Sequence, residues 1–431
     1  MSTGANTESD RGSSPAGRSH LAAALLMAVS AGALLCGYEF ARSPSNTLFM
    51  QSYGKESLPF IMGIMPFGVM AILWFYNLLL ARFGPRRTLF LTSLGSALVL
   101  GACFAAVTNG IRLGAAVLFI FREAYAVLLI EQYWSFINSK LSQPEARRWN
   151  GPIVGISSIG AITGSLLVGA TARELGTGTM LLFAAAACVP AALISDVAYR
   201  VGGSEPKPKA TEERASKHDH LAIGLFRKHP MLLWLLGIIL STQVLSAASG
   251  LALNFALYDA IPDVDAQTAW SGNYQAWING LSAVLQFGVA PFLLSVVSVR
   301  AVNLAIPTLQ IATCAWLVIA PSLWSAAICH LVFKVFDYSL FRSAKEILYI
   351  PFSWDVRYRA KEVIDVFGYR LGKGVASLAI TLAQALGVVF TGTIYGAVCL
   401  ASILSWVACI HPALRHSRLE SSRDADPEKL N

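Results

Sequence analysis

The chain has 431 residues, of which 55% are hydrophobic and 13% are charged, and its mean hydropathy is +0.56. A soluble domain carries about 25% charged residues, so this composition excludes a soluble enzyme, a nucleic-acid-binding protein and a disordered protein. The lipid bilayer is the natural solvent for such a chain, and the sequence should contain apolar spans of roughly 20 residues each.

The chain begins with a polar segment, residues 1–20, that is rich in Ser and Gly. Glu8 and Asp10 argue against an organelle transit peptide, because such peptides contain few acidic residues. No small-residue cleavage site follows the first apolar run, so we expect this run to remain as a span. Twelve apolar runs follow along the chain, at about 21–41, 58–81, 88–107, 113–138, 152–172, 178–199, 231–258, 270–294, 300–320, 323–350, 363–390 and 392–411.

The polar segment 200–229 divides these runs into two sets of six. Its composition cannot bury enough apolar surface to fold, so we interpret it as a solvated linker. The predicted fold class is an all-α membrane protein with twelve transmembrane helices in two six-helix halves, which resembles the major facilitator plan. The predicted parts are a disordered N-terminus (1–20), an N-terminal half (21–199), a cytoplasmic linker (200–229), a C-terminal half (230–412) and a cytoplasmic tail (413–431).

The distribution of Lys and Arg predicts the orientation. With the N-terminus inside, 23 of the 33 basic residues fall on the cytoplasmic side, and only Lys55, Arg112 and Arg173 fall outside. Both termini are therefore expected to be cytoplasmic. Separately, we expect the membrane to be a bacterial inner (plasma) membrane. The net charge of +8 reflects this bias and does not indicate a nucleic-acid partner.

The seven cysteines all lie in apolar runs, and they form neither a CxxC motif nor a Cys/His spacing. We interpret them as small buried hydrophobic residues and expect no disulfide, metal site or cofactor. They are Cys36, Cys103, Cys188, Cys314, Cys329, Cys399 and Cys409.

Charged residues inside the spans carry the functional argument, because a charge in a membrane is costly and usually faces a cavity. They gather in the first, fourth, tenth and eleventh runs. The basic ones are Arg42, Arg122, Lys334, Arg342, Lys345, Arg370 and Lys373, and the acidic ones are Glu39, Glu123, Glu131, Asp337 and Glu346. The alternative is that these charges only neutralise one another between helices. The basic set is larger by two, however, and an unpaired buried cation is costly unless an anion binds, so the excess indicates an anionic substrate.

The tenth run is the richest in charge. Lys334, Asp337, Phe341 and Lys345 have the spacing of a single face of an α-helix, while Arg342 has the spacing to pair with Glu346. Aromatic residues alternate with the charges of the four runs and can stack on a flat base or a guanidinium group, although each ring alone is as well explained by packing. They are Tyr38, Phe40, Tyr125, Tyr133, Trp134, Tyr338, Phe341 and Tyr369.

Two Gly-containing segments have structural interpretations. The Gly-rich stretch 151–169 lacks the Lys-Ser or Lys-Thr end of a phosphate-binding loop, so we expect Gly155, Gly160 and Gly164 to form close helix contacts. The segment 82–87, RFGPRR, resembles the signature loop of facilitators, but the Asp usual in that loop is absent. We expect this loop to serve conformational change and not substrate binding.

A longer stretch carries a family resemblance. It reads YSLF at 338–341, KE at 345–346, YIP at 349–351, IDV at 364–366 and RLGK at 370–373. This pattern resembles the ATP/ADP translocase family of plastids and obligate intracellular bacteria, whose members exchange nucleotides across a membrane. Elsewhere the resemblance rests on helix number and on residues 123–138.

The resemblance implies roles for several residues. Lys345 and Glu346 match the family's KE, Lys373 matches the Lys of its GK, and Arg42 matches the Arg of its first helix. The family's fourth helix carries an important Glu, for which Glu123 is the nearer candidate and Glu131 the second. The predicted substrate-binding residues are Arg42, Glu123, Glu131, Lys334, Asp337, Arg342, Lys345, Glu346, Arg370 and Lys373.

The chain also departs from the family pattern. Members that exchange ATP typically carry Lys-Asp where Ser45 and Asn46 stand, and Asp-Pro where Arg342 and Ser343 stand. We therefore expect weak ATP exchange and better transport of an anion with fewer charges, such as a nucleoside monophosphate or another small organic anion. The alternative is that Arg342 compensates and the substrate is ATP.

Three functions remain open from the sequence. The first is an exchanger of nucleotides or a related organic anion by alternating access, the second is a proton-coupled facilitator for another solute, and the third is a membrane sensor with this fold that transports nothing. The carboxylates within the spans are candidates to carry a proton in the second case. We expect no enzymatic activity, no nucleic-acid partner and no cofactor, and the oligomeric state stays open, with a monomer compatible.

Overall fold

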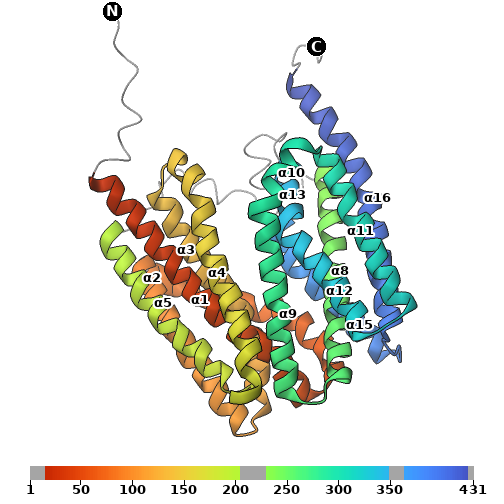
Figure 1. Cartoon of the computed structure of the whole chain (residues 1–431), viewed down its shortest axis with the longest axis horizontal. Helices are drawn as coiled ribbons and strands as arrows, with labels where there is room; N and C mark the ends of the chain where they lie inside the picture. Colours follow the sequence, from red (N-terminus) through yellow and green to blue (C-terminus); the bar gives the residue numbers. More distant parts are fainter. Residues whose placement is uncertain (1–14, 204–229, 349–363, 426–431) are drawn as a thin grey trace, which may run out of the picture. The chain divides into compact units, whose positions relative to one another are not determined.

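All regular structure in the described residues is helical (Figure 1). The computed structural model describes residues 15–203, 230–348 and 364–425. Packing divides the chain into two compact units: unit 1 comprises Met1–Ser52, Phe67–Pro208 and Asp263–Asn279, and unit 2 comprises Tyr53–Pro66, Lys209–Pro262 and Gly280–Asn431. The predicted linker lies largely outside the described residues, so the division of the sequence into halves at 200–229 stays a prediction.

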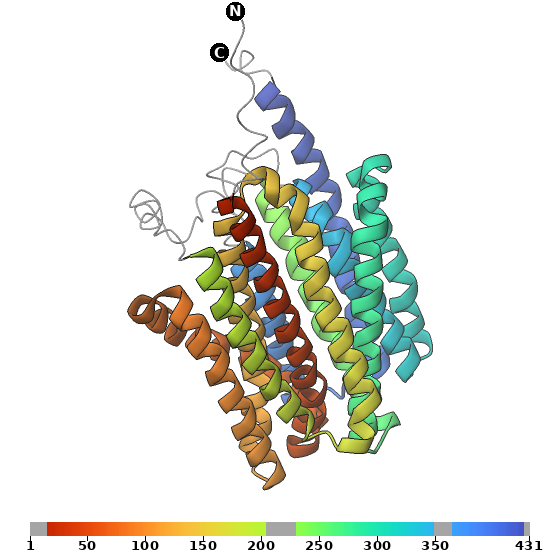
Figure 2. The ribbon, with the colours of Figure 1, turned by 60° about the vertical axis from the view of Figure 1, so that its left-hand side comes forward.

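Unit 1 is built on five long helices and the start of a sixth. The five are α1 (Pro15–Tyr53), α2 (Leu58–Thr108), α3 (Arg112–Lys140), α4 (Gln143–Leu175) and α5 (Met180–Gly202), and the sixth is α9 (Val264–Val284). The first residues of α2, up to Pro66, belong to unit 2. α1, α4 and α5 run side by side in both views (Figure 1, Figure 2). Ser30 of α1 donates a hydrogen bond of 2.6 Å to the carbonyl oxygen of Ala191 in α5. The first helix continues past its predicted end at 41, so Ser45 and Asn46 share one helix with Arg42.

Unit 2 contains the remaining helices. They are η2 (Lys55–Ser57), α8 (Pro230–Ala260), η3 (Leu285–Val289), α10 (Ala290–Val296), α11 (Val299–Ile319), α12 (Leu323–Phe336), η4 (Asp337–Phe341), α13 (Arg342–Leu348), η5 (Ile364–Leu371), α15 (Gly372–Ala385) and α16 (Gly392–Ala425). α16 packs along both α8 and α11. A non-helical segment between Ala385 and Gly392 separates α15 from α16, close to the boundary between the predicted runs 363–390 and 392–411.

The described helices account for eleven of the twelve predicted spans, and the exception is the run 363–390, whose described part forms η5 and α15. Ten of the described helices are long and apolar enough to cross a membrane. One, Lys55–Thr108, contains two predicted runs, because Gly84 has a φ of 74° and breaks the helical path between them. This left-handed backbone conformation is open to glycine without strain, which explains the turn inside the RFGPRR segment. The all-α membrane fold class is confirmed.

Many large apolar side chains lie on the surface of the helices. Trp74, Leu98, Phe292 and Trp324 each expose about two thirds or more of their area. Such a surface would be a liability in water, but it is what a bilayer solvates.

Close helix contacts explain part of the Gly-rich stretch. A Cβ atom at Gly160 would lie 2.0 Å from the carbonyl oxygen of Gly32, and one at Gly164 would lie 2.5 Å from that of Cys36. α1 and α4 therefore approach so closely that only glycine fits, as small-residue interfaces in membranes require. The prediction is wrong for Gly155, where a Cβ atom would meet no atom within 4 Å.

Three segments of unit 2 are π-helical: η3, η4 and η5. A π-turn closes hydrogen bonds one residue further along the chain than an α-turn and is frequent at functional sites. η4 begins at Asp337, and η5 includes Arg370. Both wide turns therefore fall on the segment that carries the family resemblance.

Candidate substrate-binding site

The charged residues form two clusters, one in each unit. In unit 1, the side chain of Arg122 in α3 is buried, with 7% of its area exposed. Its Nη1 atom donates to the carbonyl oxygen of Arg42 at 3.1 Å and to Oδ1 of Asn46 at 2.7 Å. Nη1 also donates to the hydroxyl of Ser45. Arg122 thereby ties α3 to the segment of α1 that contains Ser45 and Asn46.

Arg122 also contacts a carboxylate and a ring. Its Nε lies 3.6 Å from Oε1 of Glu123, and its guanidinium carbon lies 4.2 Å from the ring centre of Phe119. Glu131 lies eight residues after Glu123, which is about 12 Å along an α-helix, and its side chain is exposed. Of the two Glu candidates in this helix, the structure brings only Glu123 to the arginine cluster.

A second ion pair of unit 1 lies on α1. Nη1 of Arg42 is 3.2 Å from Oε1 of Glu39, and the guanidinium carbon of Arg42 lies 5.8 Å from the ring centre of Tyr38. Asn279 of α9 donates to the same Glu39 oxygen at 3.1 Å and to the hydroxyl of Ser165 at 3.0 Å. The other oxygen of Glu39, Oε2, is buried and accepts no hydrogen bond from any described residue.

The cluster of unit 1 is therefore largely self-neutralising. Both arginines have a carboxylate beside them, which fits the interpretation that these charges compensate one another. The excess of positive charge must be sought in unit 2.

The cluster of unit 2 lies around the wide turn η4. Two cations flank the ring of Tyr338: Nζ of Lys334 lies 5.1 Å from the ring centre, and the guanidinium carbon of Arg342 lies 6.0 Å from it. Nζ of Lys345 lies 4.7 Å from the ring centre of Tyr369, which belongs to η5. Cations and aromatic faces therefore alternate here, as the sequence predicted.

The members of this cluster differ in how deeply they are buried. Asp337 and Lys345 are buried, with 7% and 5% of their area exposed. Lys334, Glu346 and Lys373 are half-buried, while Arg342 is exposed. The side chain of Arg370 lies outside the described ones, although its backbone belongs to η5.

Two sequence predictions about this segment change. The single face running from Lys334 to Lys345 assumed an unbroken α-helix, and this assumption is wrong, because the π-turn η4 shifts the register between them. Asp365 lies in η5, and the predicted set of acidic residues did not include it. Among the described side chains of this cluster, the cations Lys334, Arg342, Lys345 and Lys373 still outnumber the carboxylates Asp337 and Glu346. The pairing of Arg342 with Glu346 stays a prediction.

Arg86 of the RFGPRR segment forms an ion pair with Asp196 in unit 1. Nε of Arg86 lies 2.7 Å from Oδ1 of Asp196 in α5. Nη2 of Arg200 lies 2.8 Å from the other oxygen of Asp196, Oδ2. These residues border a cavity of about 520 Å³, lined by Phe83, Arg86, Arg87, Phe90, Leu91, Asp196 and Arg200. Asp196 lies in the predicted run 178–199 but is absent from the predicted set of charges within the spans. Arg200 follows it by four residues, a spacing that indicates an ion pair on one helix face.

Sequence reasoning also missed Asn279 and Ser165. Both are polar residues in apolar runs, and a search for uncharged polar groups in the spans would have found them. Arg122 was recognised as a charge inside a span but was not assigned to the binding set.

Comparisons with known proteins agree with this architecture. Residues 276–416 match the family model described as TLC ATP/ADP transporter, so the resemblance seen in the sequence is confirmed over the last third of the chain. No curated protein sequence matches the chain.

Solved structures extend the likeness to the whole fold. A mutant form of the nucleoside transporter NupG superposes with a TM-score of 0.66 at 13% identity, over 91% of this chain and 99% of that one. A POT family peptide transporter gives 0.62 at 12% identity, over 90% and 96%. The xylose transporter XylE from E. coli gives 0.55 at 16% identity, over 88% and 94%.

The fold is that of the major facilitator transporters. Together with the family match, it places the protein in a class of multi-pass membrane transporters and not among enzymes. Within that class, the TLC ATP/ADP transporters are the family that the C-terminal part of the chain is similar to.

Proposed function

We propose that the protein exchanges nucleotides or a related organic anion across the membrane by alternating access. The observation that carries this proposal is the alternation of Lys334, Arg342 and Lys345 with the rings of Tyr338 and Tyr369. A phosphate group fits the cations, and a flat base fits the aromatic faces. The family match covers this same segment.

Charge supports an anionic substrate in particular. The cations of the unit 2 cluster outnumber its carboxylates, whereas in unit 1 Arg42 and Arg122 each have a glutamate beside them. An excess of positive charge within a membrane protein is costly until an anion arrives. We assign substrate contact to Lys334, Arg342, Lys345, Arg370 and Lys373, and we assign positioning roles to Arg42, Glu123, Asp337 and Glu346. Glu131 is left without a role.

The contacts of Arg122 support a substrate with fewer charges than ATP. Its Nη1 atom is engaged by Asn46, Ser45 and the carbonyl oxygen of Arg42, so this guanidinium is already held by the protein. The neutral pair Ser45 and Asn46 supplies no cation of its own. We therefore favour a nucleoside monophosphate or another small organic anion, transported in the plasma membrane with both chain termini cytoplasmic.

A ranking of competing ligands tests the substrate class. ATP, ADP, AMP, inorganic phosphate and carboxylate anions are compared as stabilisers of the purified protein against heat, because a ligand of the folded state raises its apparent stability. The proposal expects AMP to stabilise at lower concentrations than ATP or ADP. ATP or ADP ranking first at micromolar concentrations would overturn the preference and indicate ATP exchange.

One observation favours proton coupling as a second candidate. Glu39 is buried, and its Oε2 accepts no hydrogen bond from the described residues, so this oxygen is available to a proton. A proton symporter loses accumulation when an uncoupler collapses the pH gradient, whereas an obligate exchanger continues. Uptake that stalls with uncoupler would select this second function.

A further inference from the structure

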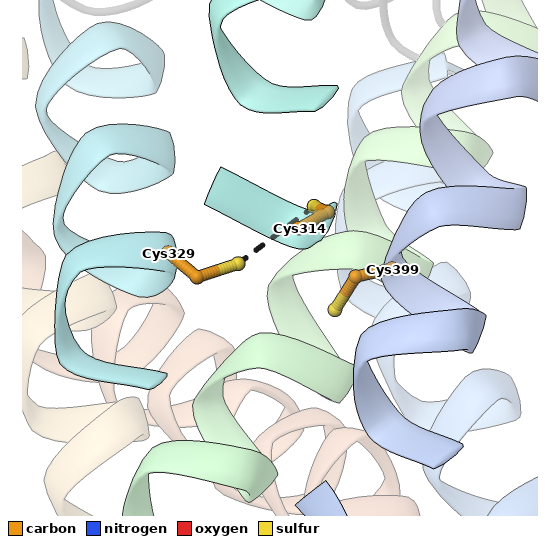
Figure 3. A group of neighbouring side chains, drawn as sticks. All are labelled: Cys314, Cys329 and Cys399. Carbon is orange, nitrogen blue, oxygen red and sulfur yellow. Dashed lines mark hydrogen bonds between the residues drawn. The ribbon is translucent and has the colours of Figure 1, made fainter. Parts of the chain in front are cut away.

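Three cysteine side chains meet inside unit 2, away from the charged cluster. Cys314 of α11, Cys329 of α12 and Cys399 of α16 point toward one another (Figure 3). All three have no exposed area, and their sulfur atoms lie within 4.8 Å of one another. Among the described residues, this is the only such group of three or more His, Cys, Asp or Glu side chains.

The spacing of the sulfurs suits a shared metal ion. The Sγ atoms of Cys314 and Cys329 lie 3.7 Å apart. Two thiolates bound tetrahedrally to zinc at about 2.3 Å each lie about 3.8 Å from one another. The Cys314–Cys329 pair thus already has the separation of two ligands on one ion, and Sγ of Cys399 lies within 4.8 Å of both.

A buried amide supports negative charge on these sulfurs. Nε2 of Gln310 donates to the carbonyl oxygen of Cys329 at 3.0 Å, and it lies 3.5 Å from Sγ of Cys329 and 3.8 Å from Sγ of Cys314. Gln310 itself is 1% exposed, so the amide is held in this orientation inside the helix bundle. Donors of this kind around ligating atoms orient them and tune their affinity for a metal.

A cavity of unit 2 lies one helical turn from the cluster. Its volume is about 1100 Å³, and Leu317, Ala326 and Tyr395 are part of its lining. These residues lie three or four positions, one helical turn, from Cys314, Cys329 and Cys399 respectively. The charged residues of the cavity are Lys55, Glu56 and Asp259, and the Lys55 ammonium group is paired with Asp259. The net charge of the lining is therefore negative, which favours the approach of a cation.

We propose that Cys314, Cys329 and Cys399 bind one soft, thiophilic metal ion such as Zn²⁺ or Cu⁺. Thiolate sulfurs select these ions over Mg²⁺ and Ca²⁺. Each ligating cysteine binds as the thiolate, so binding releases the three thiol protons and its affinity rises with pH. The bound ion would join α11, α12 and α16 and so stiffen unit 2.

Metal titration of the purified full-length protein tests this site. The reduced protein in detergent is titrated with Cd²⁺, which reports thiolate ligation by a new ultraviolet absorption band, and with Zn²⁺, which is counted by elemental analysis. We expect one ion per chain in the wild type and at least a tenfold loss of affinity in Cys314→Ser, Cys329→Ser and Cys399→Ser. The matched controls are Cys103→Ser and Cys188→Ser, two buried cysteines of unit 1, which should bind as the wild type does.

A measurement on the wild type alone guards against misfolded variants. X-ray absorption of the zinc-loaded protein should show sulfur ligands at about 2.3 Å. Zinc should also raise the melting temperature of the wild type and of both controls. Three results would each overturn the proposal. They are a ligand shell of oxygen or nitrogen alone, metal binding that survives in all three variants, and a Cys314–Cys329 disulfide in protein kept under reductant.

Discussion

At the scale of single residues, the sequence located most of the charges within the apolar runs but missed Asp196 and Asp365. The positions of these charges in the apolar runs can be read directly from the sequence, and they matter because any charge within a span is costly. Their partners could not be predicted in the same way. Arg122 contacts Ser45 and Asn46 across more than 70 positions of sequence, and such a contact depends on how α1 and α3 pack.

The first prediction concerns Lys345 and Lys373. We expect Lys345→Ala and Lys373→Ala to weaken anion binding by about 10- to 150-fold each, because a charge-assisted hydrogen bond contributes about 1.5–3 kcal/mol. Arg at either position should restore only part of the affinity, since a planar guanidinium does not replace a compact ammonium. Binding is measured as stabilisation against heat. Lys140→Ala, at the end of α3, serves as the control, and wild-type affinity in both site variants would remove these lysines from the site.

A second prediction concerns the departure at Ser45 and Asn46. The double variant Ser45→Lys/Asn46→Asp restores the pair typical of ATP-exchanging relatives, and its new carboxylate would face Arg122, whose Nη1 now lies 2.7 Å from the Asn46 amide oxygen. We expect the added cation to shift the ratio of ATP to AMP affinity toward ATP by about tenfold or more, a change of roughly 1.4 kcal/mol. Competition for uptake of a labelled anion measures this ratio. An unchanged ratio in a folded double variant would mean that these positions do not select the substrate.

At the scale of helices, the apolar runs predicted where the chain is helical but not how the helices are interrupted. The turn at Gly84 and the π-turn η4 both depend on local backbone geometry that an apolar run does not report. The prediction of one continuous face in the tenth run failed for this reason. The close contacts of Gly160 and Gly164 were foreseen because small residues one turn apart favour helix interfaces.

The contact between α1 and α4 yields a third prediction. Gly160→Ala should destabilise the protein by about 1–3 kcal/mol, because its Cβ atom would lie 2.0 Å from the Gly32 carbonyl oxygen and the helices would have to separate. Gly164→Ala should act similarly. Gly155→Ala is the matched control, since a methyl group there meets no atom within 4 Å. Thermal unfolding followed by tryptophan fluorescence compares the three, and equal melting temperatures would show that this interface tolerates separation.

The ion pair between α2 and α5 gives a fourth prediction. Asp196→Asn removes the carboxylate that Arg86 and Arg200 share, and a pair this exposed contributes only about 0–1 kcal/mol to stability. We therefore expect a lower maximal rate of uptake with unchanged substrate affinity, as a role in conformational change requires. The exchange Arg86→Asp/Asp196→Arg should recover part of the rate. A weaker affinity at a normal rate would instead place this pair in substrate binding.

At the scale of the whole molecule, composition and hydropathy were sufficient to predict the fold class, because a chain with 13% charged residues and spans of this length has few alternatives. The major facilitator fold is supported by structures that share only 12–16% of residues with this chain. Substrate identity depends instead on a few side chains, and the spacing along the sequence does not place those side chains in space. The three thiols show this limit, since Cys314 and Cys399 are 85 positions apart and meet only in the folded unit.

The central claim is that the protein exchanges organic anions, and counter-exchange in proteoliposomes tests it most directly. Purified protein is reconstituted, and uptake of labelled AMP is measured with vesicles that contain unlabelled AMP and with vesicles that contain none. We expect rapid uptake that depends on the internal anion, is insensitive to uncoupler and is lost in Lys345→Ala. Uptake into empty vesicles that an imposed pH gradient drives, or no uptake of any nucleotide or organic anion by folded protein, would contradict it.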